Sequence, residues 1–295
     1  MKVLVTGMNG FIGQHWLRAL VASGATVVAT GKGPQRFPFV ENTRYCDLDI
    51  TDAEAVNALL ATEQPTAILH AAAISKPDVC EQDHPLADRV NRAGTQHLLS
   101  AAAALGSYFC FLSTDFVFDG RKGMYVETDL PCPVNYYGHT KWQAEQLVQQ
   151  YPKGWSIVRT VTVYGQPVAG RPNILSTVVD KLKRGETYSV FDDQIRTPTY
   201  AGDLASGVAT LIRGSHNGIF HLSGEEVLTP YEMAIRTATY LGLEASLLTR
   251  VSAETLQQPA KRPMRTGFVI EKAKKAIGFN PCSFDDGLQL CFPKP

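Results

Sequence analysis

The chain has 295 residues, and its 28 lysine and arginine side chains are balanced by 28 aspartate and glutamate side chains. With 44% hydrophobic residues and zero net charge, it has neither the composition of a disordered chain nor the basic excess of a general nucleic-acid binder. A chain of this length can bury a full core, which predicts one large domain or two modest ones.

Cysteine spacing and apolar run lengths argue against a secreted, metal-binding or membrane protein. The six cysteines show no CxxC spacing and no His/Cys cluster typical of zinc, so reduced thiols are expected. No apolar run reaches the roughly 18 residues of a membrane span, and the N-terminal run is too short for a signal peptide. The sequence predicts a cytoplasmic protein with no metal, no membrane contact and no nucleic-acid partner.

Short apolar runs alternate with helical patterns in the first half of the chain. The predicted strands are Lys2–Thr6, Thr26–Thr30, Thr43–Leu48, Thr66–Ala72, Tyr108–Ser113 and Ser156–Val163. The predicted helices are Phe11–Ala22, Asp52–Thr62 with Thr51 and Glu54 as a capping box, His84–Ala104, and Tyr137–Gln150. Buried strands separated by helices imply a parallel sheet with right-handed crossovers, the doubly wound α/β class.

The pattern loosens after Gly165, where Pro167, Gly170 and Pro172 predict a loop. Later predicted elements are helices at Ile174–Arg184, Asp203–Ile212 and Thr229–Leu241, the last capped by Thr229, and extended segments at Ile195–Tyr200 and Phe220–Ser223. We expect a Rossmann-type domain over residues 1–165, with 199–222 returning to it. Residues 166–198 and 223–295 are expected to form a smaller substrate-binding lobe.

A glycine-rich turn joins the first strand to the first helix. Gly7 suits a tight turn, Gly10 allows a pyrophosphate to approach the backbone, and Gly13 allows close packing of helix on strand. Backbone N–H groups and the helix dipole then face an anion. The strand–turn–helix context predicts a dinucleotide site rather than an ordinary glycine-rich turn. Its expected cofactor contacts are Gly7, Asn9, Gly10, Phe11, Ile12 and Gly13.

The end of the second strand bears on the choice of nicotinamide cofactor. An acidic residue there would bind the ribose hydroxyls and repel a 2′-phosphate. The run Ala29–Gly33 has no acid and one lysine, so Lys32, with Arg36, favours NADP, although NAD remains compatible. The alternative for Lys32 is a solvated loop lysine.

Tyr137 and Lys141 stand four residues apart at the start of a predicted helix, which puts both on one face with Cβ atoms about 5–6 Å apart. A nearby ammonium favours the phenolate and lowers the tyrosine pKa, so that the phenol can donate a proton to a carbonyl. Thr114 ends a predicted parallel strand at the edge where ligands bind. Its hydroxyl, or that of Ser113, can bind a substrate oxygen; the alternatives are a surface Tyr–Lys pair and a threonine that caps the next loop.

The GxxGxxG spacing resembles the extended branch of the short-chain dehydrogenase/reductase superfamily. Asp47-Leu48, at the end of the third strand, matches the adenine contact of such proteins, although a loop carboxylate is the alternative for Asp47. Ala71-Ala72-Ala73, at the end of the fourth strand, matches the segment that passes the cofactor, and Asn91 matches the superfamily's structural asparagine.

Longer blocks narrow the resemblance to the dTDP-4-dehydrorhamnose reductase family. They are Ser113–Gly120, Glu127–Asp129, Pro133–Gly138, Asp193-Gln194 with Pro198–Tyr200, Asp203–Ala205, Phe220–Gly224 and Tyr231–Ala234. The resemblance implies a two-lobed reductase of nucleotide-linked 4-keto sugars, in which hydride reaches the C4 carbonyl. It makes Thr114, Tyr137 and Lys141 the catalytic set, with Lys141 also holding the nicotinamide ribose.

The resemblance also implies substrate contacts from Ser113, Thr114, Asn173, Arg196 and Arg262. Arg196 is expected to bind the nucleotide diphosphate through its bidentate guanidinium, or else to form a surface salt bridge. Arg262, within Lys261–Pro263, either closes over the substrate or belongs to a basic loop. The expected partner is a nucleotide-sugar substrate, and a homodimer is compatible with the sequence.

Two segments depart from the reductases. Thr162 takes the place of an aromatic residue that packs near the sugar, and Lys76–Glu81 is closer to the β subunit of methionine adenosyltransferase. That family member binds NADP but serves as a regulatory partner. A non-catalytic NADP-binding subunit is therefore the alternative hypothesis, and retention of Thr114, Tyr137 and Lys141 together favours the enzyme.

Overall fold

The central feature of the computed structural model, which describes residues 1–38, 40–166, 172–256 and 258–293, is one parallel sheet. Within these residues, seven strands pair in the order β10-β6-β5-β4-β1-β2-β3. Their bounds are β1 Lys2–Thr6, β2 Thr26–Gly31, β3 Thr43–Asp47, β4 Ala67–His70, β5 Tyr108–Thr114, β6 Trp155–Thr160 and β10 Gly218–His221. All the pairings are parallel, which confirms the doubly wound α/β class.

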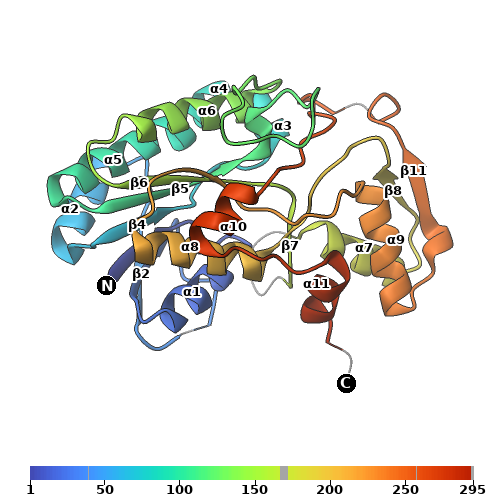
Figure 1. Cartoon of the computed structure of the whole chain (residues 1–295), viewed down its shortest axis with the longest axis horizontal. Helices are drawn as coiled ribbons and strands as arrows, with labels where there is room; N and C mark the ends of the chain where they lie inside the picture. The colour runs from blue at the N-terminus through green and yellow to red at the C-terminus, as the bar shows by residue number, and fades with distance from the viewer. Residues whose placement is uncertain (39, 167–171, 257, 294–295) are drawn as a thin grey trace.

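Helices cover both faces of the sheet (Figure 1). Helices α1 (Gly13–Ala22) and α8 (Ala201–Gly214) pack on one face, and α2 (Ala53–Glu63), α5 (Gly94–Leu105) and α6 (Tyr136–Gln149) pack on the other. Side chains of one strand alternate between the two cores, so β1 buries Val3 and Val5 on the first face and Leu4 on the second. This double burial explains the unbroken apolar runs of the sequence.

A smaller lobe lies beside the sheet, at the right of Figure 1. There β8 (Tyr188–Phe191) and β11 (Leu248–Val251) form a parallel pair that packs with α7 (Ile174–Lys183) and α9 (Pro230–Leu241). Helix α11 (Phe284–Cys291) adds a second apolar cluster. The predicted cap of α9 is confirmed: the Thr229 hydroxyl accepts from the N–H of Glu232, whose carboxylate accepts from the N–H of Thr229.

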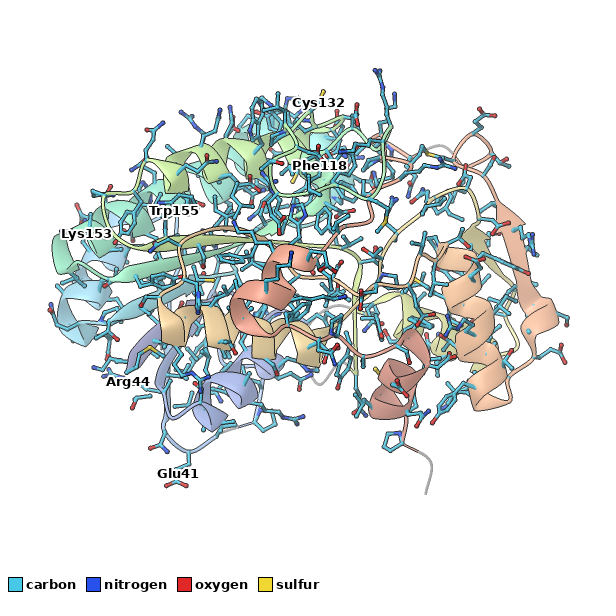
Figure 2. The ribbon with its side chains drawn as sticks, viewed as in Figure 1. Glu41, Arg44, Phe118, Cys132, Lys153 and Trp155 are labelled. Carbon is cyan, nitrogen blue, oxygen red and sulfur yellow. The ribbon has the colours of Figure 1, made fainter. Side chains whose placement is uncertain are left out.

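Short elements link the two parts of the molecule. Strands β7 (Val163–Tyr164) and β9 (Thr199–Tyr200) pair in parallel between the sheet and the lobe. Helix α10 (Glu271–Ile277) packs against β10 and α8, so the chain returns to the sheet there before α11 packs on the lobe. Charged side chains such as Glu41 and Lys153 project from the periphery, whereas Phe118 is buried among packed side chains (Figure 2).

One predicted helix is divided. The segment expected as His84–Ala104 contains α4 (His84–Ala87), a π-helical turn (Asp88–Ala93) and α5, and an unpredicted helix α3 (Pro77–Gln82) precedes it. Asp83 separates α3 from α4, since its carboxylate accepts from the N–H of Leu86 and caps α4. The apolar periodicity runs through this break, so the break leaves no trace in the pattern.

Three local expectations are wrong. Helix α2 is capped by Asp52, which accepts from the N–H of Ala55, and not by Thr51, whose hydroxyl donates to Asp49. Helix α1 begins at Gly13 rather than Phe11, because residues 10–12 form the turn. The strand expected to reach Val163 ends at Thr160, because Thr162 has a φ of 28° and interrupts it. Pro167 and Gly170 of the expected loop lie outside the described residues.

The described segments also bear on cysteine chemistry and membrane contact. All six cysteines lie in these segments and are free. Across the same ranges, no helix has the length and apolar character needed to cross a bilayer.

Candidate active site

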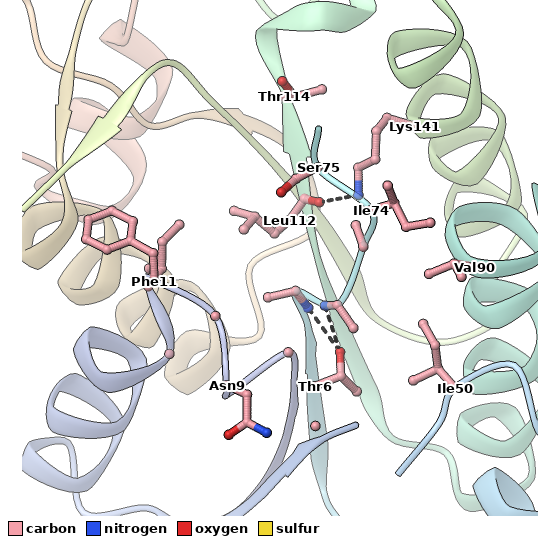
Figure 3. A pocket seen from close by; sticks show the side chains of 18 of the residues that line it. Thr6, Asn9, Phe11, Ile50, Ile74, Ser75, Val90, Leu112, Thr114 and Lys141 are labelled. Carbon is pink, nitrogen blue, oxygen red and sulfur yellow. Dashed lines mark hydrogen bonds between the residues drawn. The ribbon is translucent and has the colours of Figure 1, made fainter. Parts of the chain in front are cut away.

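A cleft of about 1240 Å³ opens at the carboxyl ends of β1, β4 and β5 (Figure 3). Successive strands run outward from β1 in one direction and from β4 in the other, so the strand order reverses between these two neighbours. Ligands bind at such a reversal in open α/β sheets, because the loops on its two sides diverge and leave a crevice. The topology therefore places the cleft where a dinucleotide is expected.

The glycine turn forms one wall of the cleft, which is lined by Gly7, Asn9, Gly10, Phe11, Ile12 and Gly13. Gly7 has a φ of +77°, and a Cβ atom on it would lie 2.8 Å from the Ala72 nitrogen. A Cβ atom on Gly13 would lie 2.0 Å from the Met8 oxygen. Backbone occupies the space where side chains at Gly7 and Gly13 would stand, so both positions require glycine, and the chain there can pass close to a bound phosphate.

A buried hydrogen-bond chain holds the opposite wall. The Thr6 hydroxyl oxygen accepts from the N–H groups of Ala71 and Ala72, both at 3.1 Å, and meets His70 Nδ1 at 2.8 Å. His70 Nε2 meets the Thr95 hydroxyl, which donates its proton elsewhere, to the Asn91 carbonyl. His70 must therefore donate from Nε2 and accept at Nδ1, and burial lowers its pKa well below the usual value, so that it stays neutral.

Ala71, Ala72 and Ala73, three of the predicted cofactor contacts, line the cleft, whereas Asn91 supports the loop behind it. The Asn91 side chain accepts from the Ile74 N–H at 2.8 Å and donates to the Ile74 carbonyl at 3.2 Å. Asn91 is not among the described residues that line the cleft. Sequence reasoning missed Thr6, His70 and Thr95. The only available signal was a histidine at the end of a fully apolar strand.

The part of the cleft at the ends of β2 and β3 contains Lys32, Arg36 and Leu48. Lys32 forms an ion pair with Asp49 at 2.7 Å, and this hydrogen bond holds the pKa of the Asp49 carboxyl at about 2. The Asp47 carboxylate accepts from the Gly33 N–H at 2.8 Å. Asp47 is not among the described residues that line the cleft. Asp47 therefore stabilises a loop, which was the alternative interpretation of this residue, whereas Lys32 and Arg36 line the cleft.

Helix α6 carries Tyr137 and Lys141 into the cleft beside Thr114, the last residue of β5. Asn135 caps the helix by accepting from the Gly138 N–H at 2.9 Å. A Cβ atom on Gly138 would lie 2.0 Å from the Phe116 oxygen, so the helix start packs directly on the chain that follows β5. The three predicted catalytic residues therefore line one cavity.

Lys141 is buried at the back of this group and donates to the Leu112 carbonyl at 2.7 Å (Figure 3). Burial lowers the pKa of its ammonium to about 7, and the Glu145 carboxylate partly opposes that effect. The Glu145 carboxylate accepts hydrogen bonds from Nε and Nη2 of Arg159, at 2.9 and 2.6 Å. It also accepts a hydrogen bond from the Ser113 hydroxyl at 2.5 Å. Ser113 therefore lines the cleft with its hydroxyl proton already donated to Glu145.

The predicted substrate ligands have different surroundings. Arg262 lines the cleft and forms a bidentate pair with Asp78, at 2.9 and 2.8 Å. Asn173 caps α7, and its amide donates to the Gly165 carbonyl at 2.6 Å. Arg196 is 3% exposed and its guanidinium contacts protein groups. Among the described residues, Thr162 lines the cleft, whereas Asn173 and Arg196 do not.

Comparison with known proteins identifies the family. The model of the RmlD substrate binding domain matches residues 1–294. The chain belongs to the RmlD substrate binding domain family. The predicted resemblance to the dTDP-4-dehydrorhamnose reductases is thereby confirmed at the level of family.

Relatives of this RmlD-family chain include proteins with different roles. It is 33% identical to dTDP-4-dehydrorhamnose reductase of Streptomyces griseus over 285 residues, 94% of this chain and 88% of that protein. It is 32% identical to methionine adenosyltransferase 2 subunit beta of Rattus norvegicus over 257 residues, 85% of this chain and 75% of that protein. A crystal structure of dTDP-4-dehydrorhamnose reductase from Bacillus anthracis in complex with NADP superposes with a TM-score of 0.87, at 29% identity over 99% of this chain and 98% of that one.

The depressed pKa of Lys141 predicts a pH dependence of stability. Between about pH 7 and pH 10.5 the unfolded chain holds a proton on this lysine that the folded chain has lost. Because the unfolded state binds more protons there, the free energy of unfolding should rise with pH relative to Lys141→Met, by up to about 1.4 kcal/mol per pH unit. Urea unfolding of both proteins from about pH 6 to about pH 10 measures this difference. A difference that stays constant over that range would contradict the depressed pKa.

Proposed function

We propose that this RmlD-family chain is an NADPH-dependent reductase of a nucleotide-linked 4-keto sugar. The observation that carries the proposal is that Thr114, Tyr137 and Lys141 line the same cleft as the glycine turn. The reductase from Streptomyces griseus and the NADP complex from Bacillus anthracis support it.

The residues present fit a dinucleotide. Gly7 and Gly13 stand where backbone leaves no room for a side chain, and Phe11 and Ile12, at the N-terminal end of helix α1, line the cleft. Lys32 and Arg36, at the adenine end, favour a 2′-phosphate. When bound, NADPH supplies the hydride. The N–H groups of Phe11 and Ile12 would hold its pyrophosphate, since those of Gly10 and Gly13 donate to the carbonyls of Gly7 and Gly10, and Ala71–Ala73 would border it.

The chain's own chemistry is proton transfer to the C4 oxygen. Tyr137 would donate its phenolic proton as the oxygen gains negative charge. An ammonium on Lys141, one helical turn away, stabilises the phenolate that remains. Thr114 places a hydroxyl group beside the tyrosine on the strand side of the cleft. Nearby apolar side chains, such as Leu112 and Phe116, limit access of water to this point.

Removing one oxygen atom tests the reaction. Tyr137→Phe should lower kcat for NADPH oxidation with a 4-keto nucleotide sugar by at least about 10²-fold, because general acid catalysis contributes about 10² to 10⁴. The Kd for NADPH, measured by fluorescence titration, should change little. Tyr136→Phe is the matched control, since the Tyr136 hydroxyl donates to Asp88 and this residue is not part of the described lining. Undiminished turnover by Tyr137→Phe would refute the assignment of the proton donor.

The cofactor preference has its own test. Replacing both Lys32 and Arg36 with alanine should weaken NADPH binding by about tenfold or more, since hydrogen bonds to charged groups contribute about 1.5–3 kcal/mol each. NADH affinity should stay within about twofold, because NADH lacks the 2′-phosphate that these cations would bind. Isothermal titration with both cofactors measures this difference. Equal losses for NADPH and NADH would show that the two side chains do not read the phosphate.

A regulatory subunit is the second candidate, favoured by the 32% identity to methionine adenosyltransferase 2 subunit beta and by Thr162 in the cleft lining. This candidate predicts NADPH binding without turnover of any nucleotide sugar tried. It also predicts a stable complex with a partner enzyme, which affinity purification and mass spectrometry would detect. Turnover that depends on Tyr137 would exclude it as the sole role.

A further inference from the structure

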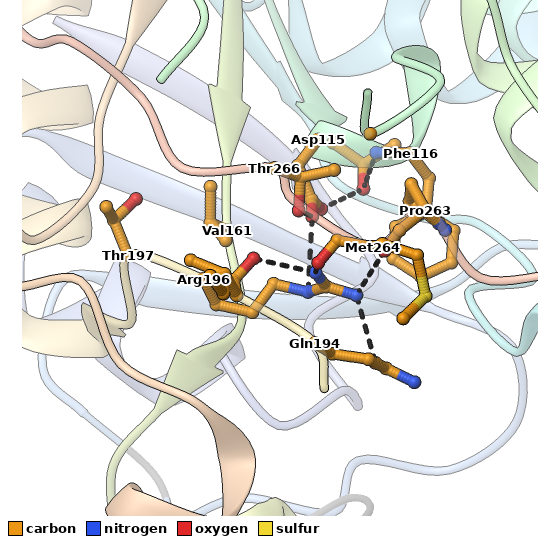
Figure 4. A network of polar contacts seen from close by, with 12 residues as sticks. Asp115, Phe116, Val161, Gln194, Arg196, Thr197, Pro263, Met264 and Thr266 are labelled. Carbon is orange, nitrogen blue, oxygen red and sulfur yellow. Dashed lines mark hydrogen bonds and ion pairs between the residues drawn. The ribbon is translucent and has the colours of Figure 1, made fainter. Parts of the chain in front are cut away.

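Beneath the cleft, a buried polar network is centred on Asp115, the residue after Thr114 (Figure 4). One carboxylate oxygen of Asp115 accepts the Thr114 hydroxyl at 3.0 Å. The other accepts the Thr266 hydroxyl at 2.5 Å and lies 3.9 Å from Arg196 Nε. Three segments distant in sequence thus converge on one carboxylate.

The guanidinium of Arg196 is occupied by protein groups. Its Nη1 donates to the carbonyls of Ile195 and Met264, at 2.8 and 3.1 Å. Its Nη2 donates to Gln194 Oε1 and to the Pro263 carbonyl, at 3.0 and 2.8 Å. The two terminal nitrogens carry four N–H groups, and four hydrogen bonds to acceptors of the described chain account for them. A diphosphate could bind Arg196 only if these bonds broke.

The orientation of the Thr114 hydroxyl follows from the same network. Thr114 donates its one hydroxyl proton to Asp115 and accepts from the Phe116 N–H at 3.2 Å. A hydroxyl group has one proton and two lone pairs, so these two bonds fix its rotation and leave one lone pair, which can accept a hydrogen bond from a donor in the cleft such as a substrate hydroxyl. The contact with Asp115 therefore decides how the proposed catalytic hydroxyl is presented.

We propose that Asp115 and Arg196 are a positioning pair that fixes the Thr114 hydroxyl, and that Arg196 acts on the site through Asp115 rather than as a ligand of the substrate. The role given to Thr114 rests on the proposed reductase function.

Arg196 has a defined task in this pair. Burial raises the pKa of the Asp115 carboxyl, and the charge of Arg196 opposes that rise. A protonated Asp115 would carry a donor of its own, whereas the carboxylate can only accept. By favouring the carboxylate, Arg196 keeps Asp115 an acceptor for both Thr114 and Thr266.

The pair also fixes the segment that carries Arg262. Besides the bonds from Arg196 to Pro263 and Met264, the Ile195 N–H donates to the Met264 carbonyl at 2.7 Å. The Thr266 N–H donates back to the Ile195 carbonyl at 3.1 Å. The strand-like contact between residues 195–196 and 264–266 thus anchors the chain from which Arg262 reaches the cleft.

Asp115→Asn and Arg196→Lys test the proposal in a double-mutant cycle. Each should lower kcat by about tenfold or more while the NADPH Kd stays within about twofold, and the double variant should be no slower than the slower single one, because both act through one contact. Asp119→Asn is the matched control: it makes the same change in the same loop, where Asp119 accepts from Tyr125 and not from Thr114. It should leave kcat unchanged.

Methyl NMR of threonine-labelled protein gives a readout that needs no turnover. The Thr114 methyl signal, assigned with Thr114→Val, should report one side-chain rotamer in the wild type and averaging among rotamers in Asp115→Asn and Arg196→Lys. If Asp115→Asn fails to fold, Thr266→Val removes one donor to the same carboxylate and should shift that signal in the same direction.

Three results would overturn the positioning pair. The first is that the losses of kcat in the two single variants add in the double variant, and the second is that Thr114 keeps a single rotamer in both variants. The third is that Arg196→Lys weakens inhibition by a nucleoside diphosphate while kcat stays unchanged. The last would make Arg196 a substrate ligand. Absence of turnover in the wild type would instead refute the reductase function, and the NMR result would still decide the orientation of Thr114.

Discussion

The attachment of helix α6 to strand β5 is the constraint on which the proposed chemistry depends. The helix bears Tyr137 and the strand ends in Thr114, and three consecutive contacts set their relative position: Gly138 against Phe116, Lys141 on the Leu112 carbonyl, and Glu145 on Ser113. The buried pair of Glu145 with Arg159 secures the far end of this contact from β6. Removing one partner from such a pair leaves an uncompensated buried charge and typically costs about 3–5 kcal/mol. The site and the fold are therefore stabilised by the same side chains.

The sheet domain could be predicted from sequence because its signals are local. Unbroken apolar strands, a glycine turn between strand and helix, and a YxxxK pair each lie within a few residues, and most neighbouring strands of the sheet follow one another in the chain. The π-helical turn around Asn91 has no such signal, and the Asn91 side chain there bonds to the backbone of Ile74, a residue outside the helix. The pair β8–β11 joins segments about 60 residues apart whose short runs show no clear period.

The candidate site divides in the same way. The turn at Gly7–Gly13 and the pair Tyr137–Lys141 were readable, because a spacing in one element determines where the groups stand. Arg196 was not, because its surroundings come from Asp115, Pro263 and Met264, and no local pattern shows that distant carbonyls will surround a guanidinium. Asp47 and Asn91 show the same limit: their places in the chain were informative, but which backbone groups they would hold depends on the folded loops.

Two of the cations that line the cleft, Lys32 and Arg262, have carboxylate partners. Lys32 is paired with Asp49 and Arg262 with Asp78, so the chain, neutral as a whole, is also locally neutral at these two points. An anion that reaches Arg262 must displace Asp78 or share the guanidinium with it, and one ion pair is then exchanged for another. Because one ion pair replaces another, the number of unpaired charges at Arg262 changes little. Anion binding to Arg262 should therefore depend less on ionic strength than binding to an open basic patch. It also disfavours weak monoanions, which cannot compete with a bidentate carboxylate held in place by the fold.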